Sequence, residues 1–111
     1  MAMETWHYAL GDFEAVGESC IFVDYMYCLD HQRFTEDDEA KLDAIHQSLP
    51  GDYDINSGTW FQGHLVWGCE PPGLQVTGTL PMKSWSDWHE RFVAAVEASS
   101  LPRRMESRSD M

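Results

Sequence analysis

The sequence predicts an α+β fold, a single small domain in which two helices lie on one face of a mostly antiparallel sheet of about five strands. Two segments carry apolar residues at helical spacing, and the others alternate or run apolar between turn residues, which predicts the order β-β-α-β-β-β-α. At 111 residues, 43% of them apolar, the chain can build one hydrophobic core. We therefore expect one domain over residues 1–101.

Two strands are expected before the first helix. Trp6, Tyr8 and Leu10 alternate on one face of a short first strand, and a Gly-Asp turn follows. Residues 19–29 are rich in β-branched and aromatic side chains, and both faces of this segment are largely apolar. A strand with two apolar faces needs neighbours that cover it, so we expect 19–29 at the centre of the sheet.

The first helix is expected over residues 36–48. Thr35 precedes it and can accept a hydrogen bond from the free amides of the first turn, and the acids that follow complement the helix dipole. Leu42, Ile45 and Leu49 form a narrow apolar stripe. A Pro-Gly pair then ends the helix.

A meander of three strands is the simplest arrangement for the next part of the chain. Turn residues divide it into strands near 52–56, 59–69 and 74–80. Alternation along the middle strand places Trp60 and Leu65 on opposite faces. The glycines that recur every five residues from Gly58 to Gly78 are interpreted as turn, bulge and close-packing positions.

The second helix is expected to run from Ser84, as the cap, to about Ser99. Asp87 stands three residues after this cap, and aromatic side chains recur at helical spacing. Residues 102–111 are polar and have no period, which predicts a disordered C-terminal tail outside the domain.

Composition and spacing argue against several classes of protein. No apolar run approaches the length of a membrane span or forms the core of a signal peptide, so we expect a cytoplasmic protein. The three cysteines and five histidines show no zinc-ligand spacing, so neither a metal site nor a cofactor is expected. No nucleophile elbow and no phosphate-binding loop occurs, and we expect no enzymatic activity.

Acidity is the strongest functional signal. Residues 1–82 contain fourteen Asp and Glu against two basic side chains, Arg33 and Lys41, and the whole chain has a net charge of −12. A protein that neutralises phosphates needs clustered Lys and Arg, so neither nucleic acid nor an anionic membrane is an expected partner. A negative surface attracts cationic ones, so we expect a basic protein partner for a monomer or homodimer of this chain.

The acids are densest at the start of the first helix and continue in the loop after it. One interpretation is a carboxylate platform that faces a partner, and the alternative is a solvated helix face that only keeps the protein soluble. Trp is frequent in binding hot spots, although burial in the core is the competing interpretation of the tryptophans. The predicted partner-facing residues are the carboxylates Glu36, Asp37, Asp38, Glu39, Asp43, Asp52 and Asp54 and the aromatic anchors Trp60 and Trp85.

Three functional hypotheses follow. The first is a non-enzymatic acidic inhibitor of the immunity or anti-defence (anti-CRISPR-like) type, which binds and blocks a basic site on a nuclease or a nucleic-acid-binding complex. The second is a chaperone or adaptor for a basic partner, which an exposed apolar patch would favour. The third and least favoured is a small acid–base enzyme that pairs Asp24 with His31 or His64 in a concave pocket.

Overall fold

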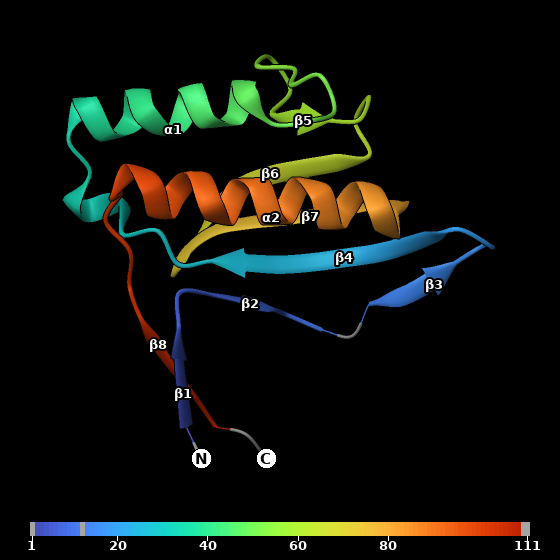
Figure 1. Cartoon of the computed structure of the whole chain (residues 1–111), viewed down its shortest axis with the longest axis horizontal. Coiled ribbons are helices and arrows are strands. Elements are labelled where there is room, and N and C mark those ends of the chain that lie inside the picture. The colour runs from blue at the N-terminus through green and yellow to red at the C-terminus, as the bar shows by residue number, and fades with distance from the viewer. Residues whose placement is uncertain (1, 12, 110–111) are drawn as a thin grey trace.

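The computed structural model of the chain describes residues 2–11 and 13–109. Within these residues, two helices and eight strands follow one another, and a short 3-10 turn precedes the first helix (Figure 1). The elements are β1 (Ala2–Thr5), β2 (His7–Ala9), β3 (Glu14–Val16), β4 (Cys20–Tyr27), α1 (Glu36–Ser48), β5 (Thr59–Trp60), β6 (Leu65–Glu70), β7 (Gly73–Pro81), α2 (Met82–Ser99) and β8 (Glu106–Ser109).

Six of these strands form one antiparallel sheet in the order β2-β4-β7-β6-β5, and β3 also pairs with β4. β4 pairs with β7 along its whole length on one side and with β2 and β3 on the other. The predicted α+β fold class and the central position of segment 19–29 are thus confirmed. β4 has hydrogen-bonded strands on both sides. Its face under the helices buries Ile21, Val23 and Tyr27, whereas Phe22 on the other face is 41% exposed.

Both helices lie over one face of the sheet, and the core fills the space between the two layers (Figure 1). Trp88 and Phe92 of α2 pack against Tyr27 of β4 at ring-centroid distances of 6.2 and 4.7 Å. The molecule is 22 Å thick along its shortest axis, which is about one helix and one sheet layer. The other face of the sheet carries the exposed side chains of Phe22 and Val66.

α1 has the bounds that the sequence predicts. The Thr35 hydroxyl accepts a hydrogen bond from the Asp38 amide at 3.1 Å, and the Asp38 carboxylate accepts one from the Thr35 amide at 3.0 Å. These two bonds form a capping box. The predicted stripe of Leu42, Ile45 and Leu49 is buried, and His46 is buried beside it.

Replacing Thr35 with alanine is expected to lower the free energy of unfolding by about 1 kcal/mol, because the Asp38 amide loses its acceptor. Urea unfolding at pH 7.5 measures this loss. The control is Thr35→Ser, which keeps the hydroxyl and should lie close to the wild type. Equal losses in both variants would contradict a role for the cap.

The predicted first strand is interrupted at Trp6, which corrects the expectation that Trp6, Tyr8 and Leu10 share one face. Trp6 is buried, and its Nε1 donates a hydrogen bond to Glu97 of α2 at 3.1 Å. The chain bends there, so β2 follows in a new direction with His7 opposite Tyr27. The bend lets the indole reach the core, where its burial is most favourable.

The predicted strands at 52–56 and 59–69 also need correction. Asp54 makes only a single bridge to Thr59, and the middle segment is broken by a turn between β5 and β6. In this turn Phe61 and Gln62 have positive φ angles of 55° and 57°. The turn resets the alternation, so Trp60 pairs with Leu65 on the same face.

α2 begins at Met82, three residues before Trp85, which would follow the predicted Ser84 cap. Pro81 ends β7 with φ of −59°, and the chain passes from it directly into the helix without a side-chain cap. Ser84 therefore lies inside the helix. Asp87 contacts Arg91 at 3.2 Å instead of taking part in a capping box.

The segment for which the sequence predicts a disordered tail contains backbone pairing in the structure. The Arg104 amide donates to the Cys28 carbonyl at 2.8 Å, and the Asp30 amide donates to the Pro102 carbonyl at 2.9 Å. Further along, β8 pairs with β1 in a two-stranded ribbon that projects from the domain (Figure 1). These pairings join the two ends of the chain, and no local sequence pattern reveals such long-range contacts.

Candidate functional site

The carboxylates at the start of α1 divide into one that caps the helix and others that extend into solvent. The backbone amide of Thr35 holds the Asp38 carboxylate and is the main cause of its lowered pKa. Glu36, Asp37 and Glu39 are exposed. Asp38 therefore stabilises the helix, whereas the other three can face a partner.

One basic side chain stands among these acids. Lys41 Nζ lies 3.2 Å from the Asp37 carboxylate, and both side chains are exposed. The other carboxylates of α1 form no ion pair with Lys or Arg among the described residues. Glu36, Glu39 and Asp43 follow at i, i+3 and i+7, so they share one side of the helix. This side carries a row of negative charge.

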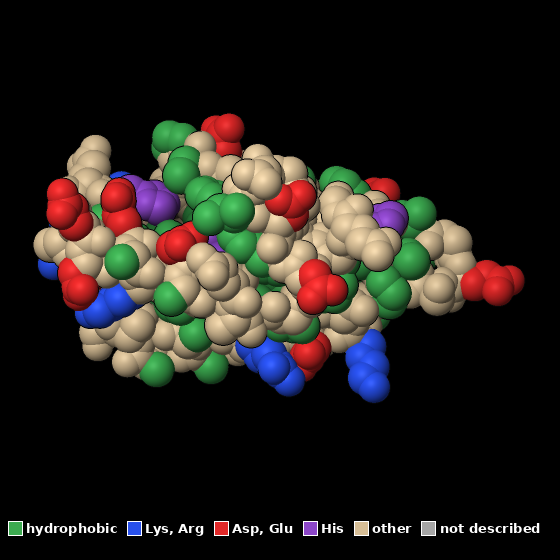
Figure 2. All heavy atoms as spheres, turned by 90° about the horizontal axis from the view of Figure 1, so that it is seen from above, with side chains coloured by type: hydrophobic (Ala, Val, Ile, Leu, Met, Phe, Trp, Pro, Cys, Tyr) green, Lys and Arg blue, Asp and Glu red, His purple; other side chains and the backbone are tan. Residues whose placement is uncertain are grey.

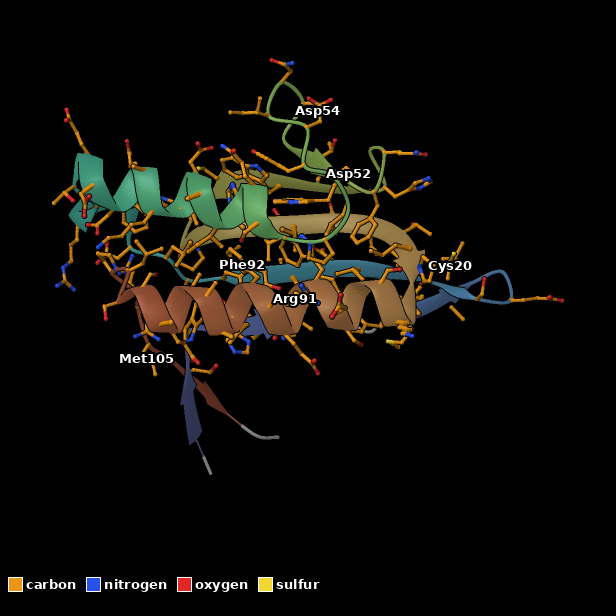
Figure 3. All side chains as sticks on the ribbon, turned by 45° about the horizontal axis from the view of Figure 1, so that its top comes forward. Cys20, Asp52, Asp54, Arg91, Phe92 and Met105 are labelled. Carbon is orange, nitrogen blue, oxygen red and sulfur yellow. The ribbon has the colours of Figure 1, made fainter. Side chains whose placement is uncertain are left out.

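Asp52 and Asp54 extend the row into the loop at the C-terminal end of α1 (Figure 3). Asp52 has a positive φ of 53°, and the Asp54 carboxylate accepts a hydrogen bond from the Asn56 amide at 3.0 Å. Both side chains are exposed. They also line a shallow depression of about 340 Å³, together with Ser57, Thr59, Gln62 and Gly63.

Figure 2 looks onto the side of the molecule formed by α1 and this loop. Asp and Glu side chains are scattered over it, and Lys and Arg lie toward its margins. α1 alone contributes about 20 Å of length at 1.5 Å per residue. The predicted carboxylates therefore lie along one extended side of the molecule rather than at a single point.

A groove of about 380 Å³ with both polar and apolar lining residues lies beside this row. It is formed where β4, β6 and α1 come together. Three of its lining residues are acids, namely Asp30, Glu39 and Glu70, and Arg104 is the one guanidinium among them. The other described lining residues are Leu29, His31, Gln32, Cys69, Pro71, Pro72 and Gly73.

The acids of this groove act on its other titratable groups. Burial raises the pKa of the Cys69 thiol, and the charges of Glu39 and Glu70 raise it further. Burial lowers the pKa of His31, which Glu39 and Asp30 partly offset. A thiol with a raised pKa is a poor nucleophile at neutral pH, so Cys69 has no sign of activation.

Sequence reasoning counted Asp30 and Glu70 as acidic but did not place them in a site. Asp30 follows β4 and Glu70 ends β6, and both strands pair with β7 in the antiparallel sense. β4 and β6 therefore point the same way, and their C-terminal ends lie at the same end of the sheet, on either side of β7. The sequence did not predict the strand order, so it could not show that Asp30 and Glu70 lie close together.

The tryptophans predicted as anchors, Trp60 and Trp85, are buried at 0% and 3% exposure. The Trp60 Nε1 donates to the His46 carbonyl at 3.0 Å, and the Trp85 ring stacks on His89 at 5.1 Å. Both rings are buried in the core, so neither can act as an anchor on the surface. This corrects the prediction.

Two other aromatic residues lie near the acidic row and keep part of their surface in solvent. The Trp67 Nε1 donates to the Tyr53 hydroxyl at 2.9 Å, and both side chains are half-buried. Trp67 lies on the helix-facing side of β6, with its ring centroid 5.0 Å from that of His46 of α1, and part of its surface remains in solvent. Its position on an alternating strand was predicted, but its partial exposure was not.

The acid–base pair of the third hypothesis is not assembled in the grooves described above. The Asp24 carboxylate accepts a hydrogen bond from Gln75 at 2.7 Å on the sheet face away from the helices. His31 lines the 380 Å³ groove, whereas His64 is exposed before β6.

Two further findings concern the residues that the structure describes. No group of three or more His, Cys, Asp and Glu side chains is arranged to hold a metal ion. No helix in the described ranges has the length and apolar character needed to cross a membrane. Comparisons with protein-family models, with curated proteins and with solved structures found no match to this chain.

Proposed function

We propose that this protein is a non-enzymatic acidic inhibitor of the immunity or anti-defence (anti-CRISPR-like) type, which binds a basic nucleic-acid-binding site on a protein partner. The observation that carries the proposal is the exposed row of carboxylates on α1 and the loop after it. Lys41 is the one Lys or Arg in this part of the chain, and it is already paired with Asp37. Regularly placed carboxylates on a rigid helix resemble the charge of a nucleic-acid backbone and compete with it for a cationic groove.

The proposed mechanism separates the approach of the partner from the fixing of the complex. Long-range attraction by the carboxylates raises the rate of encounter and weakens with salt, since the Debye length is about 8 Å at physiological ionic strength. Apolar contacts then hold the complex, and half-buried Trp67 and Tyr53 beside the row are suited to this. Guanidinium or ammonium groups of the partner fit the neighbouring groove lined by Asp30, Glu39 and Glu70.

A salt-dependent capture experiment tests the proposal. The protein is immobilised, incubated with lysate of its native cell at 50 mM and 500 mM salt, and the retained proteins are identified by mass spectrometry. The captured protein is then assayed for nucleic-acid binding with and without added acidic protein. Loss of that binding at low salt supports inhibition, and a captured protein whose nucleic-acid binding is unaffected contradicts it.

Reversing three charges of the row is expected to weaken binding of the captured partner at least tenfold. The variant is Glu36→Lys, Glu39→Lys and Asp43→Lys, which leaves the capping residue Asp38 in place. The measurement is the dissociation constant at 150 mM salt by titration calorimetry or surface plasmon resonance.

A second triple variant is the control for this experiment. Glu14→Lys, Glu18→Lys and Glu90→Lys change the net charge by the same amount at exposed positions on other elements. We expect less than a threefold effect from this control. Equal weakening by both variants would mean that total charge, rather than the α1 row, determines binding.

A chaperone or adaptor for a basic partner is the second candidate. One observation favours it, the sheet face without helices, where Val16, Phe22 and Val66 are 44%, 41% and 39% exposed. In the capture experiment, a partner that stays soluble only while the acidic protein is present, and whose nucleic-acid binding is unchanged, would support this second function.

A further inference from the structure

Two histidines meet where β2 packs on α2. The rings of His7 on β2 and His89 on α2 lie 5.3 Å apart at their centroids, in an edge-to-face arrangement. The Nδ1 atom of His7 is 2.7 Å from the Tyr25 hydroxyl, and the Nδ1 atom of His89 is 2.7 Å from the Tyr27 hydroxyl. The tautomer of each ring decides which atom donates, and a neutral imidazole can accept the tyrosine proton at Nδ1.

We propose that His7 and His89 form an acid-sensitive latch, which holds β2 against α2 while both imidazoles are neutral and releases β2, together with Trp6, when they take up protons from solvent. The latch consists of His7, His89, Tyr25 and Tyr27. Two imidazolium rings at this separation repel each other, and neither has a carboxylate in hydrogen-bond contact among the described contacts.

The charged groups around the latch do not compensate for these protons. Glu97 of α2 is the acid that acts on His7, but its carboxylate already accepts the Trp6 Nε1 hydrogen bond and lies 3.9 Å from Arg103. The groups of β4 that face the pair are the two tyrosine hydroxyls, and burial raises the pKa of Tyr25 to about 12, so these remain neutral and supply no negative charge.

Burial and the neighbouring ring act in the same direction on the histidines. Burial is the main cause of the lowered pKa of His89, about 4, and His7 lowers it further. Burial also lowers the pKa of His7. A released histidine returns to a pKa near 6.5, so the closed state loses stability relative to the open one as the pH falls below about 6.5.

β2 is the element best placed to open alone. It has three residues, it pairs only with β4 among the described strands, and the residue before it, Trp6, is buried in the core. Arg103 lies over the Trp6 ring at 5.6 Å, so release of Trp6 also removes this contact from the segment after α2. β4 and β7, in contrast, pair along eight residues and carry the core.

Amide hydrogen exchange followed by NMR tests the latch. Between pH 7.5 and 5.0 the protection factors of β2 amides, corrected for intrinsic rates, are expected to fall at least about tenfold. This opening exposes Trp6 and β2 but much less surface than global unfolding does. In about 0.5–1 M urea, exchange of the β2 amides should therefore accelerate less than exchange of the β7 amides, which occurs through global unfolding.

Glutamine variants identify the titrating groups. His89→Gln keeps a polar partner for the Tyr27 hydroxyl but takes up no proton, and His7→Gln does the same for Tyr25. Each variant is expected to reduce the fall in β2 protection, and His64→Gln, at an exposed position, should keep it in full. If one variant fails to fold, the other suffices.

Three results would overturn the latch. The first is that the protection factors of the β2 amides do not change between pH 7.5 and 5.0. The second is that they fall with the same urea dependence as those of the β7 amides. The third is that they fall by the same factor in the folded His7→Gln and His89→Gln variants as in the wild type.

Discussion

Replacing Gly78 with alanine is expected to lower the free energy of unfolding by about 2–3 kcal/mol or more, a large part of the 5–15 kcal/mol typical of a domain. Gly78 stands in the middle of β7 between Val23 of β4 and Leu65 of β6. A Cβ atom at this position would overlap the His64 carbonyl oxygen, which accepts a hydrogen bond from the Thr79 amide at 3.0 Å. The clash is with backbone, so a side-chain rotation cannot relieve it.

Gly68 on the neighbouring strand β6 provides a matched control. Its Cβ position is open, with no atom within 4 Å, so Gly68→Ala is expected to be neutral or slightly stabilising. Urea unfolding of both variants at pH 7.5 measures the difference. Similar stabilities for the two variants would show that the β6–β7 contact adjusts without cost.

Acidification from pH 7.5 to 5.0 is expected to destabilise the whole fold, and His46 is expected to account for about 2 kcal/mol of the loss. His46 is 2% exposed, and its ring is enclosed by Tyr53, Trp60, Trp67 and Phe92. Burial lowers its pKa to about 4, and the charge of nearby Asp43 offsets this only in part.

The sign of this effect follows from the direction of the shift. The native state excludes the charged ring, whereas the unfolded chain binds a proton with a pKa near 6.5. The contribution of His46 to stability is therefore full above pH 6.5 and is lost progressively as the pH falls toward 4.

The variant His46→Leu isolates this contribution. Its Nε2 atom has no hydrogen-bond partner among the described residues, so leucine removes the proton site without leaving a donor unpaired at that atom. The loss of stability between pH 7.5 and 5.0, measured by urea unfolding, should be about 2 kcal/mol smaller than in the wild type. An unchanged loss would assign the acid sensitivity to other groups.

Local signals predicted α1 correctly because every determinant of this helix lies within the helix or next to it. The Thr35 cap, the acids of the first turn and the apolar stripe all lie within a segment about four helical turns long. The start of α2 was wrong because Pro81 serves two elements at once, as the last residue of β7 and as the helix cap position. Sequence alone could not show that no connection separates them.

The candidate site was predicted in part. Glu36, Glu39 and Asp43 share one side of α1 because of their helical spacing, which the sequence shows directly. The groove was not predicted, since Glu39, Glu70 and Asp30 meet only after β7 has paired with β4 on one side and β6 on the other. The burial of Trp60 depended on a four-residue turn that resets the strand register and places this ring on the same face as Leu65.

The sequence by itself determined the α+β class, the central strand, the first helix and the acidity, because periodicity, capping and net charge are properties of local sequence or of composition. Only the tertiary structure decided the strand order, the burial of Trp60 and Trp85, the pairing of both chain ends and the contact between His7 and His89. These features depend on pairings between residues distant in sequence, where each strand has several compatible partners and the packing of the whole core selects among them.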